Sequence, residues 1–476
     1  MDKKKQADEF IKDNKDKVNK CYRMKYHFMG QFGWINDPNG FNFYKGQYHL
    51  FYQHYPYDSV WGPMHWGHAK SKDLVKWEYL PIALAPDEEY DKDGCFSGTS
   101  IEERGELYLY YTGHKYLNSN KTEYEEVQCI AHSKNGIDFE KLKCNPIINE
   151  NRQDFRDPKV IKHENFYYMF VGSNEDLKKG QILLYKSSDK FNFKFFSVAL
   201  EGDGTLGDNF ECPDYFKIQD KEVMIISPQF ISNKDKYIDR INTPIYSLGN
   251  MDFDEGKFVC EEFHPVDCGF NFYAPQTMID DKNRRILIGW MASWDSVDVT
   301  NKYKHLWSGA MTFPREVLLK NGKLLYKPID EIKNYRKNTY EIKELIMSGE
   351  KTLDCVGDSY DTEIIIDSLN AENFGIKIRV SLEEETCFEF DKKTNCFIFN
   401  RDNSGIGPKG QKRLNLDLDN NILKLRILVD KCSVEVFIND GCFVMTGLIY
   451  PKKNSNRIKL FSDSPIKIIK FEKWDI

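Results

Sequence analysis

The stretch Lys45–Gln53, K-G-Q-Y-H-L-F-Y-Q, is the first of five similar segments that decide the fold of this 476-residue chain. Each segment is a polar turn followed by a short apolar run that is typical of a β-strand. The turn positions follow one another at steps of 59, 59, 57 and 63 residues. A period of about 60 residues leaves room for four strands and predicts a five-bladed β-propeller. The five runs are Tyr48–Gln53, Leu107–Thr112, Phe166–Val171, Val223–Ser227 and Ile286–Trp290, and their turn positions are Gln47, Glu106, Asn165, Glu222 and Arg285.

A second repeated element follows the first three of these segments. H-A-K-S-K-D-L-V-K-W-E, which begins at His68, resembles I-A-H-S-K-N-G-I-D-F-E at Ile130 and L-Y-K-S-S-D-K-F-N-F-K at Leu184. Each copy combines a strand, a turn rich in Ser, Asp, Asn or Gly, and an aromatic residue that can pack between blades. Three copies in the same phase support the propeller.

The repeat stops after Arg315, and the rest of the chain has a different pattern. The segment 328–346 is rich in Lys and Glu and predicts a helical connector. The remainder has apolar residues at a period of two, which is typical of a β-sandwich, and contains no catalytic constellation. The predicted fold class is therefore all-β, a five-bladed β-propeller followed by a C-terminal β-sandwich. The predicted domains are a propeller over 1–325 with a charged N-terminal extension over 1–23, a connector over 326–346 and a β-sandwich over 347–476.

The composition excludes several classes of function. The 67 basic and 74 acidic residues are spread along the chain and give a net charge of −7, which argues against a nucleic-acid or polybasic membrane surface. No run approaches 18 apolar residues, so we predict no membrane span. The segment 1–20 lacks the apolar core of a secretory signal, and the 12 cysteines occur singly. We therefore expect a cytoplasmic protein with reduced thiols; its oligomeric state is not predicted.

Three acidic residues share one phase of the repeat. The blades of a propeller surround a central channel, so the first strand of each blade should face one axis. Counting back 8 to 11 residues from each turn position leads to Asp37, the pair Phe96 and Ser97, Asp157, Glu211 and Ala274. Taken singly, each acid suits an ordinary turn or strand end. Their common phase predicts that the three carboxyl groups meet at one mouth.

Paired carboxyl groups are the equipment of glycoside hydrolysis. In a retaining enzyme one carboxylate attacks the anomeric carbon, while a protonated acid donates to the departing oxygen. Like charges held close together disfavour each other, so the acid is expected to have a raised pKa. Glu211, flanked by Phe210 and Cys212, has the less polar neighbourhood and is the expected acid. Asp37 has polar neighbours and is expected to stay ionised.

The motifs around these acids resemble those of glycoside hydrolase family 32. The resemblance covers the chain from about residue 24 to its end, and its long motifs occur in one order. The matching motifs are W-I-N-D-P-N-G at Trp34–Gly40, G-Q-Y-H-L-F-Y-Q-H-Y-P at Gly46–Pro56, W-G-P-M-H-W-G-H at Trp61–His68, C-F-S-G at Cys95–Gly98, F-R-D-P at Phe155–Pro158, E-C-P-D at Glu211–Asp214, F-Y-A-P-Q-T at Phe272–Thr277, I-L-I-G-W-M at Ile286–Met291, and S-V-E-V-F-I-N-D-G in the last domain.

The resemblance implies a five-bladed propeller with a β-sandwich and a role for each acid. It implies that Asp37 is the nucleophile, that Glu211 is the acid/base, and that Asp157 binds fructose hydroxyls. One residue departs from the pattern: Asn271 stands before F-Y-A-P-Q where the family implies Asp, which puts a charge at that position in doubt. The resemblance also implies sugar contacts from Trp34, Asn36, Gln53, Trp61, Phe96, Ser97, Arg156 and Trp294.

Several alternatives stay open from the sequence. The implied substrate is sucrose or sucrose 6-phosphate, with fructo-oligosaccharides, inulin-type fructans or fructosyl transfer as the alternative. An inverting five-bladed glycosidase and an inactive sugar-binding protein are the rival classes, to be separated by product stereochemistry and by turnover. We expect no cofactor and no metal site, since His65 and His68 lie three apart on a strand and need not share a face.

Overall fold

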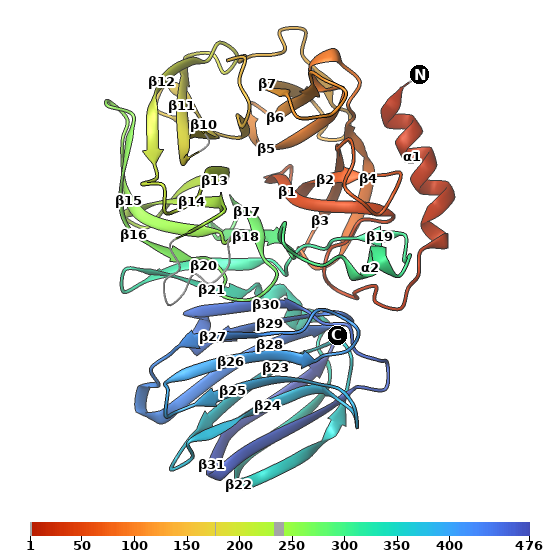
Figure 1. Cartoon of the computed structure of the whole chain (residues 1–476), viewed down its shortest axis with the longest axis vertical. Helices are drawn as coiled ribbons and strands as arrows, with labels where there is room; N and C mark the ends of the chain where they lie inside the picture. The colour runs from red at the N-terminus through yellow and green to blue at the C-terminus, as the bar shows by residue number, and fades with distance from the viewer. Residues whose placement is uncertain (1, 177, 233–241) are drawn as a thin grey trace.

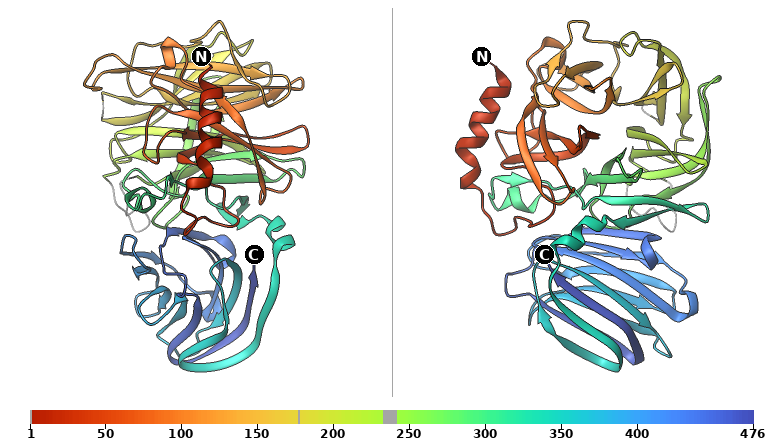
Figure 2. Two further views of the ribbon diagram at one scale, coloured as in Figure 1. Left: turned by 90° about the vertical axis from the view of Figure 1, so that its right-hand side faces the viewer. Right: turned by 180° about the vertical axis from the view of Figure 1, so that it is seen from behind.

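The computed structural model describes residues 2–176, 178–232 and 242–476, which form two bodies (Figure 1). The upper body is a β-propeller, and the lower body is a curled antiparallel sheet. Helix α1 (Lys3–Asn14) runs along the outer side of the propeller (Figure 2) and buries Ala7 and Ile11 against Ile82. No helix of the described residues is long and apolar enough to cross a membrane.

Five sheets make up the propeller in the described residues, which confirms the blade count. Within each blade the four strands are antiparallel, and the first of them lies nearest the centre of the ring in Figure 1. The first two blades are β1 (Gly33–Tyr44), β2 (Gln47–Tyr55), β3 (His65–Ser71) and β4 (Trp77–Leu84), then β5 (Gly94–Glu103), β6 (Glu106–Tyr116), β7 (Tyr124–Ser133) and β8 (Glu140–Lys141). The third and fourth are β9 (Arg156–His163), β10 (Phe166–Glu175), β11 (Lys179–Ser187) and β12 (Lys194–Glu201), then β13 (Asn209–Ile218), β14 (Lys221–Gln229), β15 (Ile245–Asp252) and β16 (Lys257–Pro265). The fifth is β17 (Tyr273–Ile279), β18 (Arg285–Trp290), β20 (Arg315–Lys320) and β21 (Lys323–Pro328).

The repeated segments occupy equivalent strands. The five apolar runs are the second strands β2, β6, β10, β14 and β18, and the second element forms the third strands β3, β7 and β11. The turns after β3 and β11 are closed by side chains: Ser71 Oγ donates to Asp73 Oδ1 at 3.1 Å, and Ser187 Oγ donates to Asp189 Oδ1 at 2.9 Å. These Ser–Asp bonds are the physical reason for the repeated turn sequence.

The ring closes through a short parallel pairing. Strand β19 (Trp307–Ser308), which follows helix α2 (Val299–Lys302), pairs with the start of β1 at Gly33. The loop after β18 of the fifth blade therefore reaches the first blade. This closure places the segment between Met291 and Trp307 beside the inner end of β1.

The lower body is a β-sandwich built from one hydrogen-bonded network. Strands β22 and β31 are long and pair along their whole length. The N-terminal part of β31 also pairs with β24 and its C-terminal part with β23, so both leaves of the sandwich share this pair of long strands. The strands, all within described residues, are β22 (Lys337–Val356), β23 (Tyr360–Asp367), β24 (Asn373–Val380), β25 (Glu385–Asp391), β26 (Cys396–Asn403), β27 (Gln411–Asn415), β28 (Ile422–Asp430), β29 (Ser433–Ile438), β30 (Phe443–Leu448) and β31 (Arg457–Asp475).

The helical connector predicted for 328–346 is wrong over most of its length. Only Asp330–Tyr335 is helical, as a 3-10 helix, and β22 begins at Lys337. The Lys and Glu residues of this segment lie on an edge strand that pairs only with β31, and charged side chains are common on such edges. Tyr340 and Ile342 alternate with them and pack against the sandwich core.

A buried ionic network joins the two bodies. His27, before the first blade, contacts Asp430 at 3.0 Å and Glu435 at 2.9 Å. Arg315 of β20 contacts the same Glu435 at 2.6 Å and Asp267 at 3.0 Å. All five side chains are fully buried. The S-V-E-V-F segment of the sandwich therefore serves to hold the propeller, and the two bodies form one packed unit.

Candidate functional site

The first strand of every blade carries a β-bulge at the same place. Each bulge lies in a short motif that ends in Pro or Gly, and the strand pairing shifts across it. A bulge re-aims the side chains beside it, which directs them toward the axis. The five motifs are Asn36-Asp37-Pro38, Phe96-Ser97-Gly98, Arg156-Asp157-Pro158, Glu211-Cys212-Pro213 and Tyr273-Ala274-Pro275.

The strand pairing shows which residues of different blades are equivalent, and it differs by one residue from the count made back from the turn positions. Cys212, and not Glu211, occupies the position equivalent to Asp157, while Glu211 is equivalent to Arg156. The backbone φ is positive at Asp157 (65°) and Cys212 (46°), which is uncommon for residues with a side chain. Such backbone geometry at a site of clustered carboxylates is typical of functional positions.

Asp37 is buried at the floor of the site, with 7% of its surface exposed. Its Oδ2 accepts a hydrogen bond of 2.6 Å from Ser97 Oγ of the second blade. Its Oδ1 is buried and has no hydrogen-bond partner among the described residues. One carboxylate oxygen is therefore held by Ser97, while the other is covered by the surrounding residues and makes no hydrogen bond with them.

Cys212 joins Asp157 to Asp37. The backbone N–H of Cys212 donates to Asp157 Oδ2 at 3.0 Å. Its Sγ lies 3.4 Å from that oxygen and 3.7 Å from Asp37 Oδ2. Burial, followed by the charges of Asp157 and Asp37, raises the pKa of the Cys212 thiol, so it stays protonated and can donate. The first, third and fourth blades thereby meet at one point.

Glu211 has a different set of partners. Arg156 Nε donates to Glu211 Oε1 at 3.0 Å, and the Tyr273 hydroxyl donates to Oε2 at 2.8 Å. Tyr273 Oη lies 2.9 Å from the carbonyl oxygen of Ser227. The carboxyl group of Glu211 is thus oriented from two neighbouring blades, while 7% of the residue remains exposed.

Burial and neighbouring charges raise the pKa values of Asp37 and Asp157. Burial raises the pKa of Asp37 to about 6; the Ser97 hydrogen bond opposes this rise, and the charge of Glu211 adds to it. Burial, followed by the charge of Glu211, raises the pKa of Asp157, which the charge of Arg156 opposes. Mutual repulsion of this kind marks groups that share one site, and it provides both protonated and ionised carboxyls near neutral pH.

The three acids lie at the floor of an open cavity of about 240 Å³. Trp61 and Trp294 stand at its mouth with 37% and 42% of their surfaces exposed, as expected for aromatic rings that can stack on a sugar. Phe96 stacks on His114 with ring centroids 4.2 Å apart. Of the predicted sugar contacts, the structure brings Asn36, Gln53, Trp61, Phe96, Ser97, Arg156 and Trp294 to this cavity.

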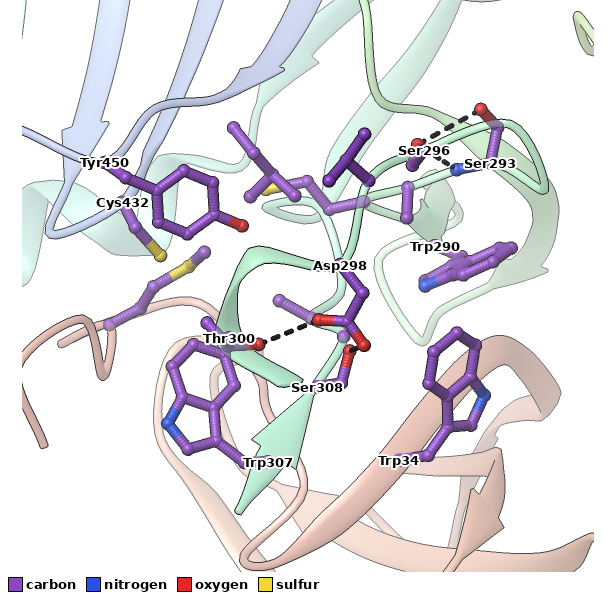
Figure 3. A pocket seen from close by; sticks show the side chains of 17 residues that line it. Trp34, Trp290, Ser293, Ser296, Asp298, Thr300, Trp307, Ser308, Cys432 and Tyr450 are labelled. Atoms are coloured by element: carbon purple, nitrogen blue, oxygen red, sulfur yellow. Dashed lines mark hydrogen bonds between the residues drawn. The ribbon is translucent and has the colours of Figure 1, made fainter. Parts of the chain in front are cut away.

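Trp34 does not line this cavity. It lines a neighbouring, smaller cavity between the propeller and the sandwich, shown in Figure 3 together with Trp290 and Asp298. Its indole Nε1 donates to Asn36 Oδ1 at 2.9 Å, so it supports a cavity residue from behind. In the neighbouring cavity the carboxylate of Asp298 accepts from Ser308 at 2.6 Å and Thr300 at 3.1 Å. Asp298 is the one acid among the described residues that line this cavity, and both of its oxygens accept hydrogen bonds. The cavity therefore lacks the second carboxyl group that glycoside hydrolysis requires.

Five cavity residues were not predicted from the sequence. His114 and Glu126 lie on β6 and β7, outside the first-strand phase, and Tyr116, Lys121 and Tyr124 belong to the hairpin that joins these strands. Glu126 accepts from Arg156 at 3.1 Å and from the Phe155 N–H at 2.8 Å. The sequence signal that could have identified Glu126 is an acidic residue directly before the apolar strand V-Q-C-I-A, because a buried strand rarely carries an acid without a partner.

Asn271 lies at the interface of the two bodies and not in the cavity. Its Oδ1 accepts from Arg401 and from the Leu448 N–H, each at 3.0 Å. Its Nδ2 donates to Ser296 Oγ at 3.0 Å. An Asp at this position would have no donor for Ser296, so the amide keeps the loop beside Trp294 in place.

This arrangement has the parts of a hydrolase that acts by carboxyl groups. It has one carboxylate held by a serine, a second carboxyl held by an arginine and a tyrosine, and exposed tryptophans at the mouth. Within residues 2–176, 178–232 and 242–476, no group of three or more His, Cys, Asp or Glu is arranged to hold a metal ion.

Comparison with known proteins identifies similar chains. The model of the family described as glycosyl hydrolases family 32 N-terminal domain matches residues 27–328. The model described as glycosyl hydrolases family 32 C terminal matches residues 331–475. Sucrose-6-phosphate hydrolase of Escherichia coli is 34% identical over 453 residues, which cover 93% of this chain and 92% of that protein. Raffinose invertase of Escherichia coli is 34% identical over 442 residues, covering 92% and 91% of the two chains. The structure of a Bombyx mori family 32 β-fructofuranosidase variant in complex with sucrose is 32% identical, with a TM-score of 0.85 and coverage of 99% and 97%.

Proposed function

The chain belongs to glycoside hydrolase family 32 and is a hydrolase of the β-fructofuranosidase type, and from this membership we propose that it cleaves terminal β-D-fructofuranosides with retention. The proposed substrate is sucrose or sucrose 6-phosphate. The proposed catalytic groups are Asp37 as nucleophile, Glu211 as acid/base and Asp157 as the group that binds fructosyl hydroxyls.

The carboxyl group of Asp37, which lines the same cavity as Asp157 and Glu211, is the observation that carries this proposal. A nucleophilic carboxylate must line the site, be held in place by the protein and be ionised. Ser97 and Cys212 both approach Oδ2, while Oδ1 has no partner among the described residues. With a pKa of about 6, Asp37 is ionised at neutral pH.

The proposed reaction has two displacements. Asp37 attacks the anomeric carbon of the fructosyl group as Glu211 donates its proton to the departing glycosidic oxygen. Glu211 then takes a proton from water, and the water oxygen attacks the same carbon and releases Asp37. Fructose leaves with its original configuration, and Glu211 is again protonated.

Asp157 and Arg156 have supporting roles in this proposal. Asp157 is buried beside the nucleophile, where a carboxyl group can accept or donate hydrogen bonds to sugar hydroxyls. Such contacts accelerate the reaction where they strengthen in the transition state. Arg156 is held by Glu126 and Asp154, and it keeps the carboxyl of Glu211 directed at the leaving oxygen.

The substrate is the finer part of the proposal. The names of the similar proteins refer to sucrose 6-phosphate, raffinose and fructofuranosides, so they do not agree on one sugar. Hydrolysis of fructo-oligosaccharides or inulin-type fructans, or fructosyl transfer by the same site, is the alternative.

An assay across sucrose 6-phosphate, sucrose, 1-kestose and inulin tests this function. We expect the highest kcat/KM for sucrose or its 6-phosphate, and no release of fructose by the Asp37→Asn variant. Highest kcat/KM for inulin would favour the alternative, and no fructose release from any of the four sugars would contradict the proposal.

A cytoplasmic location is a further part of the proposal. All 12 cysteines are free, and a chain with many unpaired thiols suits a reducing compartment. Fractionation of cells that produce the protein would test this, with enzyme activity expected in the cytosolic fraction.

A further inference from the structure

The hairpin between β6 and β7 forms one wall of the catalytic cavity. Tyr116 ends β6, Tyr124 begins β7, and Lys121 lies between them in the turn; all three line the cavity. This hairpin is separate from the bulged first strands that carry the catalytic acids. The hairpin therefore stands apart from the strands that must hold the fructosyl group.

The backbone of this turn is fixed by Asn118. Asn118 Oδ1 accepts from the N–H groups of Thr122 at 3.0 Å and Glu123 at 3.3 Å, and the Lys121 N–H donates to the Asn118 carbonyl at 3.2 Å. Lys121 has a positive φ of 59°. The turn thus holds the start of the Lys121 side chain at a defined place, while the side chain itself is exposed.

Lys121 is the uncommitted cation of the cavity wall. Among the described residues it has no ion-pair partner, and its Nζ lies 5.0 Å from the centre of the Tyr116 ring. The other cation that lines the cavity, Arg156, contacts three carboxylates. Lys115 of the same hairpin is paired with Glu125 at 2.6 Å and does not line the cavity.

The charge distribution decides what Lys121 can recognise. Asp37 and Glu126 are ionised at neutral pH, and the charge of Arg156 is already paired with three carboxylates, so a phosphate on the substrate is repelled from the floor. The fructosyl group must lie on that floor to meet Asp37, and the leaving group must then extend toward the mouth. A neutral hydroxyl gains only a hydrogen bond from a lysine, whereas a phosphate dianion gains the hydrogen bond and the attraction between opposite charges.

We propose that Lys121 is the specificity residue that binds the phosphate of sucrose 6-phosphate, so that the chain prefers the phosphorylated disaccharide to sucrose. This inference rests on the proposed function, because it assigns the leaving group to the side of the cavity that the hairpin forms. Lys121 takes no part in bond cleavage and acts only on the phosphorylated substrate.

Steady-state hydrolysis of sucrose 6-phosphate and sucrose by the full chain tests this proposal. We expect Lys121→Met to lower kcat/KM for sucrose 6-phosphate about tenfold or more, and kcat/KM for sucrose by less than about twofold. Lys121→Arg should retain most of the preference, and Lys115→Met, the matched control on the same hairpin, should leave it unchanged. Glucose 6-phosphate should inhibit the wild type more strongly than glucose, and Lys121→Met should remove that difference.

The outcomes are distinguishable from failure of the proposed function. If the wild type cleaves sucrose but has no preference for the phosphate, or if Lys121→Met affects both substrates equally, this inference is overturned and the proposed function stands. If Lys115→Met has the same effect as Lys121→Met, the hairpin and not the Lys121 charge is responsible, which also overturns it. If neither substrate releases fructose, both proposals fail.

Discussion

The Nε atom of Arg156 lies 3.0 Å from Oε1 of Glu211, so a cation of the third blade holds the carboxyl group of the fourth. The Nη1 atom of the same guanidinium contacts Asp154 at 2.7 Å and Glu126 at 3.1 Å. Burial acts to raise the pKa of Glu126, but the charge of Arg156 and the His114 hydrogen bond lower it to about 2. Glu126 is therefore ionised and fixes Arg156 in the position from which it directs Glu211.

The first prediction tests this positioning role. Glu126→Gln should lower kcat for sucrose about tenfold with little change in KM, because the acid is displaced while the sugar contacts remain. Asp154→Asn, which removes a more exposed partner of the same guanidinium, should lower kcat by less than about threefold. Wild-type kcat in Glu126→Gln would show that Glu211 needs no support from this chain of contacts.

The second prediction concerns the three acids. Asp37→Asn and Glu211→Gln should each reduce kcat at least about a hundredfold, the usual scale for loss of a nucleophile or an acid/base. Asp157→Asn should also cause a large loss, because it removes contacts that strengthen in the transition state. Melting temperatures should report whether each variant remains folded.

Asp298→Asn is the matched control for these variants. It changes a half-buried carboxyl of the neighbouring cavity, and its activity should stay within about threefold of the wild type. A loss as large as that of Asp37→Asn would mean that the reaction takes place in the cavity of Figure 3.

The third prediction uses the pKa of Asp37. The raised pKa of about 6 means that Asp37 is protonated below this pH and cannot attack, so kcat/KM should fall as pH decreases through about 6. The Ser97 hydrogen bond lowers the pKa of Asp37, so Ser97→Ala should move this acid limb about one pH unit higher. If kcat/KM of the Ser97→Ala variant falls at the same pH as that of the wild type, the fall is caused by protonation of a group other than Asp37.

The propeller could be predicted because each blade repeats the same physical pattern. The run after Gln47 and its four equivalents form the second strands, and the turns after Ser71 and Ser187 are closed by Ser–Asp bonds. The convergence of Asp37 and Asp157 followed from the same repeat. The helical reading of 337–346 failed because composition was weighed above the alternation of Tyr340 and Ile342.

Other features depend on contacts between distant parts of the chain. Counting residues did not separate Glu211 from Cys212, because the bulges that set their register are a property of strand pairing. Trp34 lies only two residues before Asn36 in the sequence, yet its ring lines another cavity. Lys121 carries no signal of its own, since only the fold brings the hairpin to the cavity.

The fourth prediction concerns stability. Burial acts to lower the pKa of His27, but its hydrogen bonds to Asp430 and Glu435 raise it to about 9, against an ordinary value of about 6.5. This stabilisation is fully present below about pH 6.5 and is lost as pH rises through about 9, with a free energy on the order of 3 kcal/mol. Chemical denaturation should therefore give a lower free energy of unfolding at pH 9 than at pH 7.

His27→Gln is the control for this effect. The variant should be less stable at pH 7 and should lose most of the decline between pH 7 and pH 9, because no histidine remains to titrate. Glu435→Gln should destabilise the protein by about 3–5 kcal/mol, since it leaves Arg315 and His27 buried with one partner fewer. A decline of the same size in His27→Gln would assign the pH dependence to other groups.

The stereochemistry of azide rescue tests the assignment of Asp37 and Glu211 most directly. With an activated β-fructofuranoside, Asp37→Ala leaves room for azide to attack the anomeric carbon once, and the account predicts fructosyl azide of inverted configuration. In Glu211→Ala the nucleophile remains, so azide should intercept the fructosyl-enzyme and give the retained product after two inversions. The opposite pairing of products would exchange the roles of the two residues, and net inversion by the wild-type enzyme would contradict the retaining mechanism itself.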